Sequence, residues 1–174
     1  MNRKGKFYIL NWIFSYGSAS SNRLLAYANS AAELGYDVEI VAFLRLDLRN
    51  CQPRSGVIIR GLRPCKVESK VFSKLLSFFT TIWFLLADVK KEDKLLLYGA
   101  AEYLPLLVWL RRKQTYFEVT ECPDLFKPRT YPWRYYKKLW KRLNGIFVIS
   151  GNLKQYFVCL LYTSDAADDL IGVD

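Results

Sequence analysis

Short apolar runs alternate along this chain with longer stretches of helical spacing. The apolar runs are rich in branched and aromatic residues and lie at 6–13, 37–43, 56–62, 94–98, 114–120 and 145–150. Helices are predicted at about 20–34, 67–90, 102–112 and 131–143, and one more starts at Asn152. Strands that are apolar throughout and alternate with helices predict a parallel sheet covered on both faces. We therefore expect a doubly wound, Rossmann-like α/β fold of about six strands.

The residue types that are missing exclude several kinds of chemistry. The chain has 174 residues, which suits one ordinary domain, and it contains no histidine. Histidine-based acid–base catalysis, a Ser-His-Asp triad and a histidine-ligated metal are therefore excluded. Its four cysteines are widely spaced and form no CxxC pair, so we expect neither a metal site nor a disulfide framework. We expect no cofactor, and a reducing, cytoplasmic setting.

The positive charge is concentrated in the first 158 residues. All 26 basic residues lie there, together with 12 of the 16 acidic residues, which gives this part a net charge of +14. Such a balance points to an anionic partner, which could be a nucleotide phosphate, an anionic lipid or nucleic acid. Charge alone does not choose among the three.

The loops that follow the strands contain the candidate binding residues. In a doubly wound sheet, ligands bind beyond the carboxyl ends of the strands at the point where the strand order reverses. The loop after the first strand is rich in small residues, and a helix is expected to begin at Ser20 as its N-cap. The predicted substrate-binding residues, drawn from several strand ends, are Gly17, Ser18, Ser20, Asn22, Arg23, Tyr98, Gly99 and Glu121. For Tyr98 and Gly99 a simple turn is favoured over a binding role, whereas for Glu121 a binding role and a structural one, capping a turn or pairing with an arginine, are equally supported.

Three segments resemble family 4-type GT-B glycosyltransferases. The opening YILNW…GSASSNR–LLAYANSAAELGYDVEIVAF is similar to that family's first strand, small-residue loop, helix and second strand. TYFEVTECPDLF resembles its fifth strand, which ends in an acidic residue just before a proline, and GIFVISGNLKQYF resembles its sixth strand and following helix. The resemblance covers nearly all of residues 6–158.

The resemblance implies that residues 1–158 are the incomplete N-terminal, acceptor-side domain of such an enzyme. The family transfers a sugar from a nucleotide sugar to a glycan or lipid-linked acceptor, and a second, C-terminal domain holds the donor. No part of that second domain is present, so we expect the chain alone to be inactive and leave the catalytic residues unassigned. Many members carry a histidine in this domain, and that feature cannot be transferred to a chain without histidine.

A strongly amphipathic stretch at 131–143 separates aromatic from basic side chains. Helical spacing places its aromatic residues on one side and its basic residues on the other, a pattern that suits an anionic membrane surface. The predicted membrane-binding residues are Trp133, Arg134, Lys137, Lys138, Trp140, Lys141 and Arg142. The alternative is that the aromatic side packs on the sheet while the basic side is only solvated. We expect peripheral attachment on the inner face of the membrane.

The last sixteen residues, 159–174, resemble a translated sequencing adapter. The transposase end sequence ctgtctcttatacacatct, read in register, encodes Cys159–Ser164, and its continuation gacgctgccgacga encodes Asp165 to Asp168. After a variable index, the constant stretch gtgtagat completes Gly172 and gives Val173 and Asp174. We expect this segment to be non-native and the native part of the chain to extend no further than about Val158. The alternative is a native C-terminal helix with an acidic end.

Two other functions compete with the glycosyltransferase hypothesis. A stand-alone basic α/β module that binds nucleic acid is supported by charge alone, because the sequence has no RNA- or DNA-binding motif; we therefore expect no nucleic-acid partner. A secreted protein would need the weak N-terminal hydrophobic run to act as a signal peptide, but this run is short and contains Asn11. The apolar stretch 75–87 is too short to cross a bilayer and is better explained as a buried helix.

Overall fold

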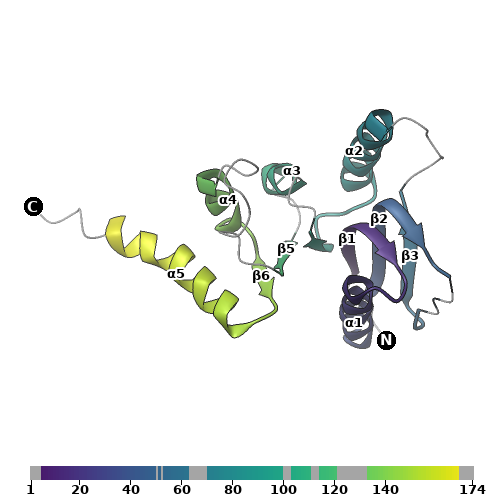
Figure 1. The fold of residues 1–174 in the computed structure, drawn as a ribbon, viewed down its shortest axis with the longest axis horizontal. Coiled ribbons are helices and arrows are strands. Elements are labelled where there is room, and N and C mark those ends of the chain that lie inside the picture. The colour runs from purple at the N-terminus through teal and green to yellow at the C-terminus, as the bar shows by residue number, and fades with distance from the viewer. Residues whose placement is uncertain are drawn as a thin grey trace, which may run out of the picture.

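Six parallel strands form a single sheet (Figure 1). The computed structural model describes residues 5–49, 51, 53–62, 70–99, 103–110, 114–120 and 133–168. The strands run in the order β3-β2-β1-β4-β5-β6, and every neighbouring pair is parallel. Their bounds are β1 Lys6–Ser15, β2 Asp37–Asp47, β3 Val57–Gly61, β4 Lys94–Tyr98, β5 Gln114–Val119 and β6 Gly145–Val148. The predicted doubly wound, Rossmann-like fold is confirmed.

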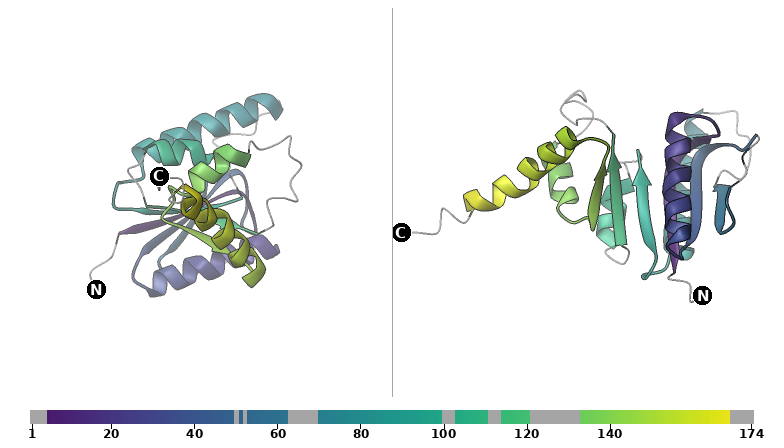
Figure 2. Two further views of the ribbon diagram at one scale, coloured as in Figure 1. Left: turned by 90° about the vertical axis from the view of Figure 1, so that its left-hand side faces the viewer. Right: turned by 90° about the horizontal axis from the view of Figure 1, so that it is seen from below.

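Helices cover both faces of this sheet. Helix α1 (Ala19–Glu33) lies on one face, while α2 (Lys70–Ala87), α3 (Leu104–Leu110) and α4 (Trp133–Trp140) lie on the other (Figures 1 and 2). Helix α5 (Gly151–Asp168) follows β6 and extends away from the sheet (Figure 2). Each crossover therefore returns the chain to the start of a parallel strand, as doubly wound sheets require.

The face under α2, α3 and α4 is packed with aromatic side chains. Tyr8 of β1 meets Phe84 of α2 edge to face, with ring centroids 5.3 Å apart. Near the carboxyl ends of the strands, Trp12, Phe43 and Tyr103 form a cluster with centroid distances of 4.9–5.7 Å. These rings belong to the larger of the two hydrophobic cores, and aromatic pairs of this kind add to the stabilisation from burial.

The opposite face carries a smaller core beneath α1. Small residues of the helix, Ala28 and Ala31, and the fully buried Leu24 lie against Ile9 and Ile40 of the central strands. Alanine at these positions lets the helix approach the sheet closely. Gly35 follows the C-cap residue with φ of 90°, the left-handed conformation that glycine adopts without strain.

Several element boundaries differ from those predicted. Strand β4 has the predicted bounds, but β2 runs on to Asp47 because it continues to pair with β1 beyond a bulge between Asn11 and Ile13. The N-cap of α1 is Ser18, not Ser20, because the Ser18 side chain accepts from the Ser21 amide.

Helix α5 continues through much of the segment that we interpret as adapter-derived. Leu153 and Phe157, which precede that segment, are buried in the larger core, and the Phe157 ring lies 5.2 Å from that of Trp140. Side chains beyond Cys159 lie outside the described part of the chain. In that described part, none of the helices is long and apolar enough to cross a membrane.

Candidate functional site

Two glycines mark the carboxyl edge of the sheet where the strand order reverses. The chain runs from β1 outward to β2 and β3, then returns to the other side of β1 with β4, so the reversal lies between β1 and β4. Gly17, after β1, has φ of 86°, and Gly99, after β4, has φ of 65°. A Cβ added at either glycine would meet no heavy atom within 4 Å. Their left-handed backbone, rather than crowding, is what requires glycine here.

The serines of the loop after β1 stabilise the start of α1. The Ser18 hydroxyl accepts from the Ser21 amide at 3.2 Å and donates to the Ser21 hydroxyl at 2.9 Å. The Ser21 hydroxyl is fully buried and also accepts from the Ser15 amide at 3.0 Å. Ser20 lies 3.2 Å from Ser18, oxygen to oxygen. Ser18 and Ser21 therefore hold the loop shape, and a ligand would meet the backbone of this loop before these two hydroxyls.

A buried carboxylate lies beside this loop and is paired with an arginine of α1. The Glu118 side chain, from β5, is 0% exposed, whereas that of Arg23 is 34% exposed. Arg23 Nη1 donates to Glu118 Oε1 at 3.2 Å, and the Tyr27 hydroxyl donates to the same oxygen at 3.3 Å. Glu118 Oε2 is buried and has no hydrogen-bond partner among the described residues. The pair therefore presents the guanidinium of Arg23 outward and keeps the carboxylate inside.

Burial controls the titration of this cluster. It raises the pKa of Glu118 above the usual glutamate value, although Arg23 and the Tyr27 hydroxyl oppose the shift by stabilising the charged form. Burial, followed by the neighbouring Glu118 charge, also raises the pKa of Tyr27 and of Tyr98. Both tyrosines thus remain neutral hydrogen-bonding groups near neutral pH. Arg23 supplies the positive charge that a ligand would meet.

The structure brings together some of the predicted substrate-binding residues. Tyr98 is the register partner of Glu118 across β4 and β5, so it belongs to the same corner as Arg23. Gly17 and Gly99 flank that corner at the ends of β1 and β4. Asn22 is exposed one residue before Arg23. Glu121 lies outside the described residues.

The predicted membrane-binding residues in and just after α4 differ in their exposure. Trp140 is only 6% exposed and packs against Tyr136 and Phe157, so the prediction that it contacts a membrane is wrong. Its helix face lies on the sheet, where burying a large aromatic ring stabilises the fold. Lys138, Lys141 and Arg142 are exposed. The side chains of Trp133, Arg134 and Lys137 lie outside the description.

Sequence reasoning missed Glu118 and Tyr27. Glu118 is a charged residue within the otherwise apolar end of strand 114–119, which is unusual unless the charge is paired. Arg23 and Tyr27 are four residues apart and therefore share one face of α1. These two patterns are the signals that could have indicated an ion pair between α1 and the sheet. They do not indicate which strand provides the carboxylate.

Comparisons with known proteins do not assign this site. No protein-family model matches the sequence, and no curated protein matches it significantly. The described residues also contain no group of three or more side chains suited to hold a metal ion. What is shown is therefore the fold and the geometry of this corner: a fixed guanidinium and two left-handed glycines at the reversal point of a parallel sheet.

Proposed function

We propose that this chain is the acceptor-side half of a glycosyltransferase that transfers a sugar from a nucleotide sugar to a glycan or lipid-linked acceptor. The observation that carries the proposal is the position of Arg23, held by a buried glutamate at the reversal point of the sheet. In doubly wound sheets this is where phosphate-bearing and polyhydroxylated ligands bind. The resemblance of residues 6–158 to family 4-type GT-B enzymes supports the same assignment.

Each group in the corner has a role in this proposal. The backbone at Gly17 and Gly99 allows a ligand to approach closely, because no Cβ stands in the way. Arg23 contacts a phosphate or sugar oxygen through the N–H groups that Glu118 does not use. Glu118 orients Arg23 and is a positioning residue. In the family that the chain resembles, a second domain binds the donor, so the proposal requires such a domain in addition to this chain for sugar transfer.

The test compares sugar transfer by this chain with transfer by an enzyme restored with its donor-binding domain. We expect the chain alone to transfer no sugar from a panel of nucleotide sugars, and the restored enzyme to be active. In the restored enzyme, Arg23→Gln should lower kcat/KM by about tenfold or more, since a charged hydrogen bond to the ligand is lost. Arg54→Gln is the matched control, because Arg54 is also ion-paired, to Glu33, but far more exposed. Robust transfer by the chain alone, or equal effects of both variants, would refute the proposal.

We further propose that the acceptor is reached at the inner face of a membrane, with Lys138, Lys141 and Arg142 contacting anionic lipid. The support is the exposure of Lys138 on α4 and of Lys141 and Arg142 in the turn that follows it, while the aromatic residues Tyr136 and Trp140 of that helix are buried. Changing all three to glutamine should weaken vesicle binding by about 1 kcal/mol per charge near the surface. The loss should shrink as salt is added. Vesicle binding that is unaffected by the glutamine substitutions and by added salt would contradict this contact.

A further inference from the structure

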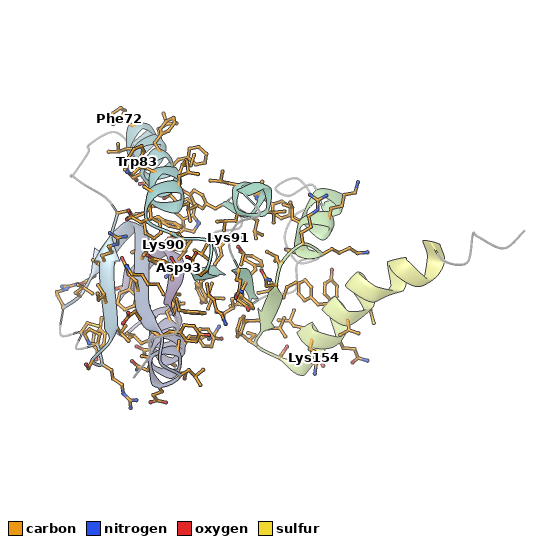
Figure 3. All side chains as sticks on the ribbon, turned by 180° about the vertical axis from the view of Figure 1, so that it is seen from behind. Phe72, Trp83, Lys90, Lys91, Asp93 and Lys154 are labelled. Atoms are coloured by element: carbon orange, nitrogen blue, oxygen red, sulfur yellow. The ribbon has the colours of Figure 1, made fainter. Side chains whose placement is uncertain are left out.

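Helix α2 exposes a continuous apolar stripe. Phe72, Leu75, Phe79, Trp83 and Leu86 are all more than half exposed, with Phe79 at 64% and Trp83 at 73%. They follow one another at intervals of three or four residues, so they share one face of the helix. Figure 3 shows Phe72 near the start of α2 and Trp83 further along the helix. Large apolar side chains gathered in this way mark an interaction surface.

The inner face of α2 is partly polar, which reverses the usual arrangement. Ser77 and Thr81 are 1% and 0% exposed, on the side of the helix that also buries Phe84 and Leu85. Thr81 donates its hydroxyl to the Ser77 carbonyl of its own helix at 2.7 Å. A helix that met only water on its outer side would carry its aromatic residues inward and its hydroxyls outward. The outer face is therefore suited to an apolar environment.

The charge around the stripe selects an anionic environment. Helix α2 contains Lys70 and Lys74 and no acidic residue. Asp88, which follows the helix, is engaged by Arg60, whose Nη2 lies 2.9 Å from Asp88 Oδ2. Lys90 and Lys91 are exposed just beyond it (Figure 3), beside the exposed Glu92, so the lysines near the stripe outnumber the unpaired acids. Aromatic side chains bordered by lysines are typical of helices that lie in a bilayer interface.

The stripe lies in the same layer as the basic residues of α4. Helices α2, α3 and α4 cover one face of the sheet, while α1 covers the other (Figures 1 and 2). Lys138 of α4 is exposed, whereas Tyr136, Leu139 and Trp140 of the same helix are buried, and Lys141 and Arg142 are exposed in the turn directly after it. One side of the molecule thus offers an apolar helix and a basic helix together.

We propose that α2 docks on an anionic lipid bilayer, with its stripe immersed among the headgroups and upper acyl chains. The helix lies in the interface and does not cross it. This inference deepens the proposed membrane contact and rests on it: α4 supplies electrostatic attraction, and α2 supplies the apolar insertion that fixes depth. The basic residues at α4 add to the lysines near α2, and α2 provides the exposed apolar area that α4 lacks.

The test measures binding of the whole chain to vesicles of phosphatidylglycerol mixed with phosphatidylcholine. Phe79→Ser combined with Trp83→Ser should lower vesicle affinity by about tenfold or more. The double variant lacks two large apolar side chains whose transfer from water into the bilayer favours binding. Leu34→Ser is the matched control, since Leu34 is 62% exposed but lies at the end of α1 on the opposite face. Melting curves should show that all variants remain folded, because each altered side chain is exposed.

A second measurement reports immersion directly. The chain contains five tryptophans, so the contribution of Trp83 is the difference between the unmodified chain and Trp83→Phe. Phospholipids brominated on their acyl chains should quench part of the tryptophan fluorescence, and Trp83→Phe should lower the quenched fraction while retaining binding. An equal quenched fraction in the two vesicle-bound proteins would overturn the inference, because the stripe would then remain in water.

The outcomes separate this inference from the proposals on which it rests. If the α2 variant binds as the unmodified chain does while the α4 glutamine variant does not, membrane contact stands and the role of α2 is refuted. If no form of the chain binds vesicles, both are refuted, and the sugar-transfer assay still decides the enzymatic proposal separately. If the chain instead self-associates without lipid, and Phe79→Ser with Trp83→Ser abolishes this, the stripe is a contact between copies and the inference is overturned.

Discussion

The two faces of the sheet differ in what they bury: aromatic side chains on one face and a charged side chain on the other. Beneath α2, α3 and α4 the sheet carries aromatic rings in mutual contact, and the buried polar groups there include the hydroxyls of Ser77 and Thr81. Beneath α1 the core is smaller, and it adjoins the buried Glu118, whose Oε2 has no hydrogen-bond partner among the described residues. A buried charge costs stability unless it is fully paired. The α1 face therefore contains a buried charge that pairs with Arg23, whereas the other face is stabilised mainly by apolar and aromatic packing.

The largest effect is expected from breaking the aromatic face. Phe84→Ala should lower the free energy of unfolding by about 3–5 kcal/mol, because it removes a ring that is 2% exposed and leaves a cavity beside Tyr8. Its sequence neighbour provides the control: Trp83→Ala should change stability by no more than about 0.5 kcal/mol. Urea unfolding of both variants measures the difference. Similar losses for the two residues would mean that Trp83 is also covered.

A smaller effect is expected at the loop that leads onto the α1 face. Gly17→Ala should cost about 1–2 kcal/mol, since φ of 86° strains any residue with a Cβ even where space is free. Gly151→Ala is the control at another helix start, where a Cβ would also meet open space and no positive φ is required. In the restored enzyme Gly17→Val should reduce turnover with the fold intact. Full activity of that variant would remove the loop from the site.

The pH dependence of stability should report the cost of burying Glu118. Because its folded pKa is raised, the native state holds this proton more tightly than the unfolded chain does. The contribution of Glu118 to stability is therefore greatest below the usual glutamate pKa and falls as pH rises through the raised value. Relative to Glu118→Gln, the unmodified protein should lose stability over that window. Parallel stability curves for the two proteins would show that Arg23 fully compensates the burial.

The smallest effect is expected from removing the C-terminal segment. Deleting residues 159–174 should leave the melting temperature within about 2 °C, because Leu153 and Phe157, which pack on the core, are retained. Differential scanning calorimetry of the two forms would measure this. A fall of many degrees would show that the segment packs natively and would contradict its adapter origin.

The fold could be predicted from the sequence because each element carries its own local pattern. Strand β4, for example, is a run of apolar residues between Lys94 and Gly99, and no distant contact is needed to recognise it. The site was less predictable. Arg23 was identified from its loop, but Glu118 acquires its role only when α1 packs on the sheet, because its partner Arg23 lies 95 residues away in sequence. Periodicity also cannot say which side of a largely apolar helix faces outward, so the stripe on α2 was not foreseen.

The strand order has a consequence for how the chain can assemble as it is made. The first strand to be synthesised, β1, becomes an interior strand, and β2 and β3 then add on one side of it. The next three strands add in order on the other side, so every new strand joins a free edge and none is threaded between two that are already paired. Each stage therefore leaves a usable template for the next strand. During synthesis from the N-terminus, each strand can therefore pair with the edge of the existing sheet in the order in which it leaves the ribosome.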